Sequence, residues 1–430
     1  MINNLLIESN LFLLPNNARA ISQFFAPGVE AKGEDGERII LSSIRTLLGL
    51  SEKLVYEYLS NIELGFSLRY KDFRSVLLKR AEEAKKFLPL DVPLSSLSYP
   101  RQLLLGAYFS NEYTFESTSL CNPSIVLNPI QSSLGAIDFI LSVRGIGEGH
   151  VSSIGFREGS IDQENRIKIK ATEKYPSLGE LEVDSLHNEQ YQISFALDTD
   201  LSERIIFPSL SLERAGMEDA RFVRFVEDSG ESRYLAPYTA FDGRGISQRI
   251  LETKDFLLFS SFGITGIASF SKGLAIFPRK IRGKYVALAR VFRENNSIIY
   301  TDDLSTWDIV INMQSPVQDW EGIQLGNCGS PIETDQGWLV ITHGVGAMRA
   351  YSLGAILLDL DYPENIIATL DVPLKSASIE HRDGYVPNVV YSCGALRVGD
   401  TLLLPYALAD YKISFATLSI SDLIASMRKS

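Results

Sequence analysis

The feature that most constrains the fold of this chain is a short apolar run that recurs at nearly regular spacing. Five such runs end in polar or charged residues: AIDFILSVRG from Ala136, RYLAPYTAFD from Arg233, GKYVALARVF from Gly283, GWLVITHGVG from Gly337 and DTLLLPYALAD from Asp400. The last four begin 50, 54 and 63 residues apart, and the first begins 97 residues before the second. A repeat near ~50 residues suits one four-stranded blade of a β-propeller. The sequence therefore predicts a mainly β chain, a five-bladed β-propeller with an insertion between the first two runs.

The N-terminal part of the chain has a different pattern. Two stretches, 37–61 and 68–88, carry helical periodicity, and in the second the apolar residues recur at three- and four-residue steps with charged residues between them. Pro100 is placed to start a third helix. We therefore expect a small helical N-terminal domain over residues 1–118 and the propeller over 119–430.

Two further segments carry local signals. Residues 157–215 are rich in charge and include alternating runs such as RIKIKATEK, so we expect either an elaborated outer part of the first blade or an inserted hairpin. The closing sequence, SISDLIASMRKS, predicts a short helix that packs outside the last blade.

Composition excludes several classes of function. The net charge is −12 and no Lys/Arg stripe is present, so binding to a nucleic-acid backbone is not expected. The mean hydropathy is +0.04, and no apolar run approaches the ~20 residues that span a bilayer, so no membrane partner is expected. Four histidines without HxH or HExxH spacing argue against a histidine-rich metal site. We expect neither a metal nor a cofactor.

Cysteine usage bears on the compartment. Cys121, Cys328 and Cys393 are odd in number, far apart and without CxxC spacing, so a disulfide framework is not expected. The first residues, MINNLLIESNLFLLPNN, lack a basic n-region and a small-residue cleavage site. We expect a mature, cytoplasmic protein.

The sharpest local motif is GMEDAR at residues 216–221, directly before the apolar run FVRFV. Neighbouring residues of a strand face opposite ways, so we expect Asp219 and Arg221 to share one face and Glu218 to take the other. An arginine lowers the pKa of a nearby carboxyl group, whereas burial or a second acid raises it. The motif alone fits a structural ion pair as well as a catalytic acid.

Other polar residues fall where the predicted inner strands end. They are Arg144, Asp242, Lys280, Arg290, His343 and Asp410. One such residue would be an ordinary strand terminus. Acids and bases that recur at this position in several blades predict a polar funnel at the propeller axis.

Several ordered motifs resemble glycoside hydrolase family 130, the β-mannoside phosphorylases and β-mannosidases. They are Asn122-Pro123, EDAR at 218–221, FPRKI at 277–281, DDLSTW at 302–307, GSPI at 329–332, Gly337-Trp338 with His343-Gly344, and VPNVV at 386–390. The resemblance covers about 122–418 and implies the five-bladed fold. By the same resemblance, the helical residues look like the N-terminal extension of a longer subgroup.

The resemblance also implies roles for single residues. Asp219 matches the family's general acid, which passes its proton through the 3-hydroxyl of the mannosyl unit to the glycosidic oxygen, with inversion at the anomeric carbon. Asn122 and Asp410 match positions that hold the mannosyl residue. The basic positions that line the site, some of which bind phosphate in the phosphorylases, match Arg144, Lys280, Arg290 and His343. The predicted substrate-binding set is completed by Arg221, Tyr238, Asp242 and Asn388.

Two departures from the phosphorylase pattern favour hydrolysis. Ala220 stands where proline is commoner, and the phosphate-binding residues cannot be placed in FDGRGISQ after Ala240. We therefore predict an inverting glycoside hydrolase that acts on β-mannosides, with β-1,2-linked manno-oligosaccharides as substrates. Such a hydrolase needs a second carboxylate to activate water, and Glu321 is the first candidate for this base, with Glu252 the second.

Two alternatives stay open. A β-mannoside phosphorylase would use the same pocket, take inorganic phosphate as co-substrate, release mannose 1-phosphate and need no general base. A non-catalytic sugar-binding propeller would bind without turnover. The sequence also leaves open a homo-oligomer formed through the helical domain.

Overall fold

The computed structural model describes residues 5–28, 34–131, 135–184, 190–379 and 382–429. By compactness the chain divides into two units. Unit 1 comprises residues 1–16, 115–173 and 177–430, and unit 2 comprises 17–114 and 174–176. No helix in the described part of the chain is long and apolar enough to cross a membrane.

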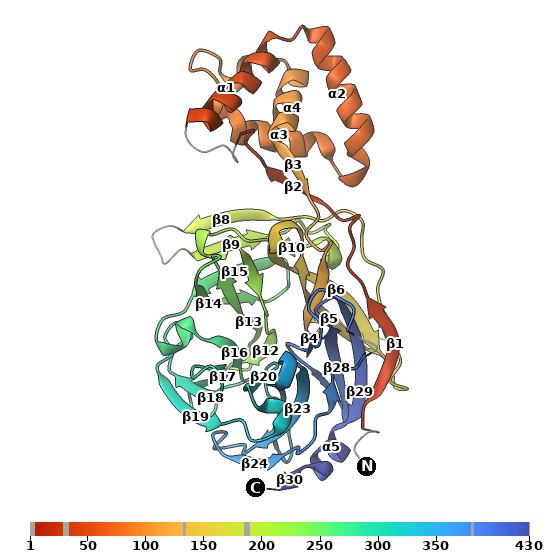
Figure 1. Ribbon diagram of the computed structural model, residues 1–430, viewed down its shortest axis with the longest axis vertical. Coiled ribbons are helices and arrows are strands. Elements are labelled where there is room, and N and C mark those ends of the chain that lie inside the picture. The colour runs from red at the N-terminus through yellow and green to blue at the C-terminus, as the bar shows by residue number, and fades with distance from the viewer. Residues whose placement is uncertain (1–4, 29–33, 132–134, 185–189, 380–381, 430) are drawn as a thin grey trace. The chain divides into compact units, whose positions relative to one another are not determined.

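The described strands of unit 1 form five antiparallel sheets, numbered here in chain order (Figure 1). Sheet 1 holds β4 (Ser119–Leu127), β5 (Ile137–Ile146), β6 (Ser152–Ile161), β7 (Ile167–Ile169) and β10 (Ile205–Ile206). Sheet 2 holds β8 (Glu180–Asp184), β9 (Gln190–Ser194), β11 (Gly216–Glu218), β12 (Val223–Val226), β13 (Ser232–Phe241), β14 (Ile246–Thr253) and β15 (Leu258–Gly263). Sheet 3 holds β16 (Lys272–Ile276), β17 (Tyr285–Arg290), β18 (Asn296–Thr301) and β19 (Ile309–Gln314).

The remaining two sheets complete unit 1. Sheet 4 holds β20 (Gln324–Asn327), β21 (Ile332–Thr334), β22 (Gly337–Val345), β23 (Tyr351–Leu358), β24 (Ile366–Thr369), β25 (Lys375–Ser376) and β30 (Arg428–Lys429). Sheet 5 holds β1 (Ile7–Leu13), β26 (Val390–Tyr391), β27 (Leu396–Val398), β28 (Thr401–Leu408) and β29 (Lys412–Ser419). The predicted C-terminal helix is confirmed as α5 (Ile420–Ser426).

The five repeated apolar runs are confirmed as strands, one in each sheet. They form β5, β13, β17, β22 and β28. These strands are largely buried along their length, and β22 is buried at every position. Each of these strands is covered on both faces, so its residues are apolar at successive positions rather than alternately apolar and polar.

Each sheet packs against the next, and sheet 5 packs against sheet 1. In β17, for example, Ala287 and Ala289 belong to a core shared with sheet 2, whereas Val286 and Leu288 belong to a core shared with sheet 4. Three other buried clusters join sheets 1 and 2, sheets 4 and 5, and sheets 5 and 1. The sheets therefore close into a ring, and alternate residues of each central strand face its two neighbours.

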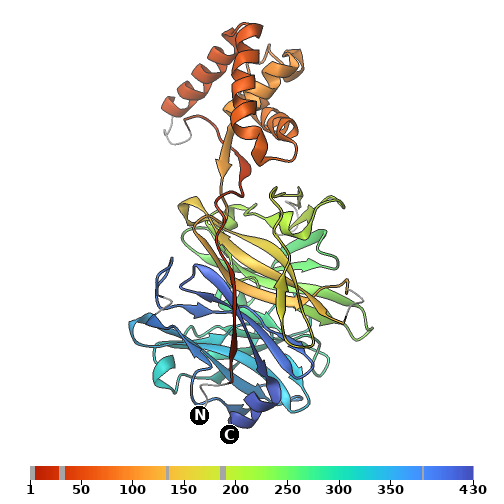
Figure 2. The ribbon, with the colours of Figure 1, turned by 90° about the vertical axis from the view of Figure 1, so that its right-hand side faces the viewer.

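The N-terminal strand β1 pairs with β29, a strand from near the C-terminus. In β1, Ile7 pairs with Thr417 and Leu13 pairs with Ile413 of β29, in antiparallel register. Figure 2 shows β1 running along sheet 5. The first residues of the chain therefore complete the last sheet, although the sequence analysis assigned them to the helical domain.

The charged segment 157–215 contributes to two sheets. β7 and β10 both pair with β6, whereas β8 pairs with β9 and β9 pairs with β15. The segment therefore extends sheet 1 and also adds two strands to sheet 2.

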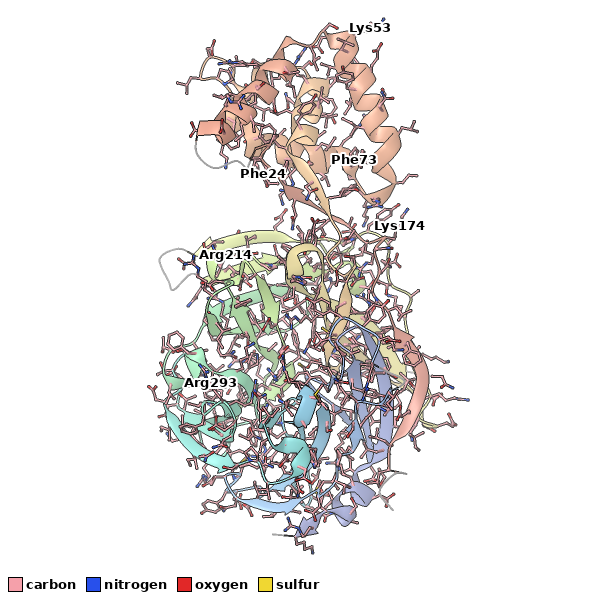
Figure 3. The ribbon with its side chains drawn as sticks, viewed as in Figure 1. Phe24, Lys53, Phe73, Lys174, Arg214 and Arg293 are labelled. Atoms are coloured by element: carbon pink, nitrogen blue, oxygen red, sulfur yellow. The ribbon has the colours of Figure 1, made fainter. Side chains whose placement is uncertain are left out.

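Unit 2 is a small helical body with a two-stranded sheet, and Figure 3 labels Phe24 and Phe73 within it. Its elements are β2 (Ile21–Phe24), α1 (Glu34–Gly49), α2 (Glu52–Phe66), α3 (Phe73–Ala84), α4 (Tyr99–Tyr108) and β3 (Ser110–Tyr113). The predicted helix over 37–61 is two helices, because Ser51 caps α2 by accepting a hydrogen bond from the Leu54 amide. The predicted third helix is α4, which ends at Tyr108 and is followed by β3.

Candidate active site

The GMEDAR motif breaks its strand at Asp219. β11 ends at Glu218, and Asp219 has φ +54°, in the left-handed region. The chain then resumes with the Arg221 amide donating to the Pro237 carbonyl at 2.9 Å. This break makes the predicted facing of Glu218 wrong, because strand alternation does not continue through a residue with positive φ.

Both acids of the motif instead face one guanidinium. Arg144 Nη2 donates to Glu218 Oε1 at 2.8 Å, and Arg144 Nη1 lies 3.7 Å from Asp219 Oδ1. Lys272 Nζ donates to Glu218 Oε2 at 3.0 Å. The Asp219 side chain is 20% exposed and that of Lys272 39%, so the cluster is accessible from solvent.

Arg221 lies beneath Asp219 and is almost fully buried. It donates from Nε to the Cys328 carbonyl at 3.0 Å and from Nη2 to the Tyr391 hydroxyl at 2.8 Å. Its Nη2 also lies 3.6 Å from Asp219 Oδ2, so the predicted proximity of Asp219 and Arg221 is confirmed. A buried arginine held by several acceptors places a fixed positive charge under the carboxylate.

Opposing effects set the pKa of Asp219. Burial acts to raise it, but the positive charges of Arg221 and Arg144, with weaker contributions from Lys272 and Arg290, outweigh burial and hold the pKa below its ordinary value. Arg144, Arg221, Lys272 and Arg290 outnumber the two carboxylates of the motif, Glu218 and Asp219, which leaves the cluster suited to a further anion.

Two more polar residues of unit 1 have unusual backbone angles. They are Asn122 in sheet 1 and Asp410, which follows a strand of sheet 5. Asn122 has φ +46° at a bulge in β4, and Asp410 has φ +43° in the turn after β28. Asn122 Oδ1 and Asp410 Oδ1 are buried and have no hydrogen-bond partner among the described residues. Two strained residues with unpaired acceptors indicate a site for a ligand that carries hydroxyl groups.

Asp410 is electrically coupled to the EDAR cluster. Burial raises its pKa to about 6, against the pull of Arg144, and the negative charges of Asp219 and Glu218 add to the rise. Its charge therefore changes near neutral pH.

We expect Asp410→Asn to stabilise the protein above pH 6. The folded state holds the proton more tightly than the unfolded chain does, so wild-type stability falls as the pH rises from 3.8 to about 6. The neutral amide avoids this cost, which amounts to about 3 kcal/mol. Denaturant unfolding at pH 4 and pH 7.5 measures it, and an equal effect of the substitution at the two pH values would contradict the coupling.

A second set of unpaired groups surrounds Arg290 and His343. Both side chains contact Gly326, where an added Cβ would meet Arg290 Cδ at 2.5 Å and His343 Cε1 at 2.9 Å. Arg290 Nε, His343 Nδ1 and both polar side-chain atoms of Asn327 are buried without a hydrogen-bond partner in the described part of the chain. Burial, followed by the charges of Arg290 and Arg221, holds the pKa of His343 well below its ordinary value, so the imidazole is neutral.

Aromatic rings hold His343 in place. The Tyr351 ring stacks on it with a centroid distance of 6.1 Å, and the Tyr391 ring meets it edge-on at 4.8 Å. Tyr391 also accepts the hydrogen bond from Arg221, so one phenol links the surroundings of His343 to those of Asp219.

Three predicted binding residues lie in other surroundings, whereas the fourth, Asn388, is bonded to Tyr351, whose ring stacks on His343. Tyr238 is fully buried in the core of sheets 1 and 2, and its hydroxyl bonds Glu213, so it has no open ring face for a sugar. Asp242 closes a turn by accepting from the Arg244 and Gly245 amides. Lys280 pairs with Glu227 at 3.5 Å and lies over the Tyr285 ring. Asn388, at φ +65°, accepts from the Tyr351 amide through its carbonyl at 2.8 Å.

The two candidate bases also have structural partners. Glu321 is buried, and its Oε2 accepts from the Val317 and Gln318 amides, each at 3.1 Å. Glu252 pairs with Arg233 at 3.2 Å. The contacts of Glu321 are those of a turn cap, and its role as a base stays a prediction.

Sequence reasoning missed Lys272, Asn327 and Tyr391, which the fold brings to these groups. Lys272 begins β16, whereas the polar residues predicted for the site were those at the ends of inner strands. Lys280, eight residues further on, was therefore predicted instead. Lys272 could have been predicted by considering basic residues at both ends of each inner strand.

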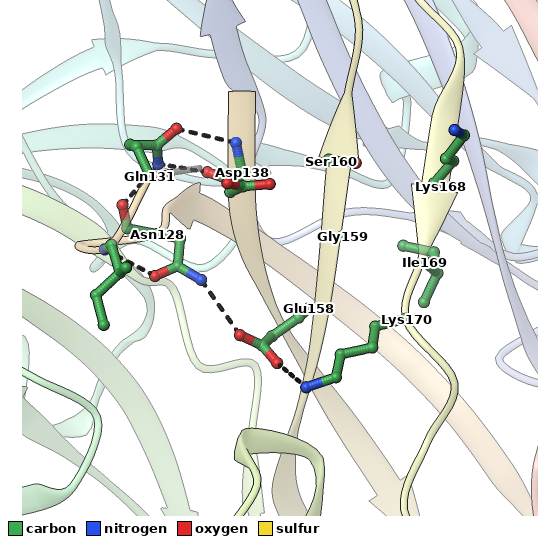
Figure 4. Close-up of a pocket in the computed structure, with 10 residues that line it drawn as sticks. Asn128, Gln131, Asp138, Glu158, Gly159, Ser160, Lys168, Ile169 and Lys170 are labelled. Atoms are coloured by element: carbon green, nitrogen blue, oxygen red, sulfur yellow. Dashed lines mark hydrogen bonds and ion pairs between the residues drawn. The ribbon is translucent and has the colours of Figure 1, made fainter. Parts of the chain in front are cut away.

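The polar pocket in Figure 4 is a different kind of site. It measures about 490 Å³ and lies along β5, β6 and β7. Its groups bond one another: Asn128 Nδ2 donates to Glu158 Oε1 at 3.4 Å, and Lys170 Nζ donates to Glu158 Oε2 at 3.0 Å. The unpaired groups around Asp219 make that cluster the stronger candidate.

Comparison with known proteins gives concordant matches. Residues 181–429 match the sequence model of a family described as beta-1,4-mannooligosaccharide phosphorylase. The chain is 33% identical over 216 residues to a 1,2-beta-oligomannan phosphorylase of Thermoanaerobacter sp. (strain X514), covering 49% of this chain and 71% of that protein. It is 29% identical over 315 residues to a beta-1,2-mannobiose phosphorylase of the same strain, covering 71% and 97%.

A solved structure matches the fold. The beta-1,2-mannobiose phosphorylase of Listeria innocua, in complex with beta-1,2-mannobiose, superposes with a TM-score of 0.54 at 19% identity. The match covers 72% of this chain and 92% of that one.

Proposed function

This chain belongs to glycoside hydrolase family 130, and on that premise we propose that it is a β-mannoside phosphorylase that cleaves β-1,2-linked manno-oligosaccharides and releases mannose 1-phosphate. The two sequence relatives described above are phosphorylases of β-1,2-linked mannosides. They support the phosphorylase alternative better than the hydrolase that the sequence analysis preferred. Members of the family are glycoside phosphorylases and glycosidases, so the chain is an enzyme.

The proposed scaffold is a five-bladed propeller. The ring of five sheets, each sharing a core with the next, supports this assignment. The helical residues 17–114 are then an addition to the catalytic ring, whose own role is a separate question.

The observation that carries phosphorolysis is the excess of positive charge around Asp219. Arg144 and Arg290 each keep a buried Nε without a partner among the described residues, and Lys272, which also bonds Glu218, is partly exposed. Phosphate needs several charge-assisted donors at close range. We assign Lys272, Arg290 and His343 to the phosphate, and Asn122, Arg144 and Asp410 to the mannosyl unit.

The proposed reaction is a single inverting displacement. A phosphate oxygen attacks the anomeric carbon, the bond from that carbon to the glycosidic oxygen breaks, and Asp219 supplies a proton to the departing oxygen through the 3-hydroxyl of the sugar. Phosphate brings its own negative charge, so no carboxylate has to activate water. The proton that Asp219 gives up is restored from the next phosphate or from solvent.

Phosphate also helps Asp219 to act as an acid. In the free enzyme the surrounding cations keep its pKa low. A bound phosphate dianion offsets the charges of Lys272 and Arg290, and the sugar excludes water, so both changes raise that pKa. The acid is thus protonated most readily once both substrates are bound.

We expect product formation to require phosphate. The protein is incubated with β-1,2-mannobiose or β-1,4-mannobiose, with and without phosphate, and the products are identified by chromatography. Mannose 1-phosphate should appear only with phosphate, and faster from the β-1,2 substrate. Equal release of free mannose without phosphate would instead establish the hydrolase.

Glu321→Gln separates the two reactions. For a phosphorylase we expect turnover to change less than about twofold, while weaker capping lowers stability by about 1 kcal/mol. For a hydrolase that uses Glu321 as its base, turnover should fall by about 10²-fold or more. Steady-state rates and denaturant unfolding of the same preparation decide between the two.

A further inference from the structure

A cavity of about 430 Å³ lies within unit 2, apart from any group assigned to the reaction. It is lined by residues of β2, α2, α3, α4 and β3 and by the turn between α2 and α3, and it is partly open to solvent. Its volume is at the lower end of the range for ligand pockets.

One side of the cavity is aromatic. The rings of Tyr70 and Phe73 lie 5.4 Å apart at 32°, and Phe66, also in the lining, is 45% exposed. Figure 3 labels Phe73 in unit 2. Aromatic rings at a cavity wall offer flat apolar faces against which a ring-shaped ligand can pack.

The cavity lining also carries hydrogen-bonding groups. Glu112 Oε2 accepts from Arg69 at 3.2 Å, whereas its Oε1 is buried and has no hydrogen-bond partner among the described residues. The Ser22 hydroxyl accepts from Arg80 Nε at 3.2 Å, which leaves its own proton to donate. Burial, followed by the charge of Glu112 and a hydrogen-bonding interaction with that carboxylate, raises the pKa of Tyr70, so the phenol keeps its proton. A buried acceptor without a partner is costly unless a ligand supplies a donor.

The charges of the lining residues are balanced. Glu112 is paired with Arg69, and Arg80, which holds Ser22, is paired with Glu83 at 2.6 Å. An ionic ligand would therefore have no opposite charge to meet. The cavity suits a neutral ligand that combines an apolar ring face with hydroxyl groups, and a pyranose has both.

We propose that the cavity binds one neutral mannosyl unit of a manno-oligosaccharide, as a second carbohydrate site on the enzyme. The identity of the sugar rests on the proposed function; the cavity, its rings and its unpaired acceptor do not. Such a site would hold the substrate chain without taking part in the reaction.

Equilibrium dialysis with radiolabelled β-1,2-mannobiose tests the proposal on full-length protein. Asp219→Asn serves as the parent, since it should bind without turnover. We expect it to bind two moles of sugar, and the addition of Asn122→Ala to reduce this to one. Ala107→Leu fills the cavity from α4 and should remove the other mole. Glu112→Gln should weaken that site about tenfold, while Glu57→Gln, which alters an exposed ion pair of α2, should leave both sites unchanged.

Several outcomes would overturn the proposal. The first is that the Ala107→Leu variant and the Glu112→Gln variant both still bind two moles of sugar. Another is loss of all binding on Asn122→Ala, and a third is displacement of the sugar by cyclohexanol, a ring with one hydroxyl group, as well as by methyl β-mannoside. Thermal unfolding checks that each variant is folded. If sugar binds at the cavity but wild-type protein shows no phosphate-dependent turnover, the proposed function alone is refuted. If wild-type protein turns over mannobiose with phosphate but the Asp219→Asn parent binds only one mole of sugar, the proposed second site alone is refuted.

Discussion

Asp219→Asn should reduce turnover by about 10²–10⁴-fold while the protein stays folded. A glycosidic oxygen is a poor leaving group without a proton, and a positioned general acid contributes about 10²–10⁴-fold. The amide keeps the size of the side chain but has no proton to give. Steady-state release of mannose 1-phosphate measures the loss.

The structure offers a matched control for this substitution. Asp242→Asn makes the same chemical change at a carboxylate that only closes a turn, so its activity should be close to wild type. Asp219→Asn also weakens the attraction to Arg221 and Arg144, so its melting temperature should fall by a few degrees at most. A folded Asp219→Asn protein with normal turnover would remove Asp219 as the acid.

Lys272→Met should raise the KM for phosphate by about ten- to hundredfold. Losing one charge-assisted hydrogen bond to an anion costs about 1.5–3 kcal/mol. Methionine keeps much of the length of the side chain without its charge. The KM for mannobiose should change less, because the effect falls on the group that binds phosphate.

Lys280→Met is the control, since it removes the same charge from the segment between β16 and β17 of the same sheet. Lys280 is paired with Glu227, whereas Lys272 is bonded to Glu218 of the EDAR motif, so loss of Lys280 should leave the KM for phosphate near the wild-type value. Initial rates at varied phosphate and saturating mannobiose compare the two variants. A larger effect at Lys280 than at Lys272 would restore the assignment made from sequence.

The central strands were predictable because burial on both faces leaves a simple signal. A strand such as β22, packed between two sheets, must be apolar at successive positions. The number of such apolar runs in the chain therefore indicates the number of central strands. The helical periodicity of unit 2 was equally visible. The division of the predicted helix at Ser51 was not predicted, although a serine before a helix is a known start signal.

The site was predictable only in part, because its geometry depends on residues that leave regular structure. Asp219, Asn122 and Asp410 all have positive φ, so strand alternation could not place their side chains. Lys272 and Tyr391 reach the cluster through pairings between segments far apart in the sequence, which no local pattern reports. Tyr238 and Glu321 stood in suggestive sequence surroundings, but hydrogen bonds within the fold already occupy their polar atoms.

The strand β1 implies that unit 2 is an insert rather than a leader. The chain enters sheet 5, leaves for about a hundred residues, and returns where the Asn16 amide bonds the Glu116 carbonyl at 3.0 Å. Since departure and return are neighbours, a short peptide could bridge them and the whole helical body could be excised without opening the circle of sheets. Loss or gain of residues 17–114 would therefore change the chain at this one junction and leave the strand pairings around Asp219 as they are.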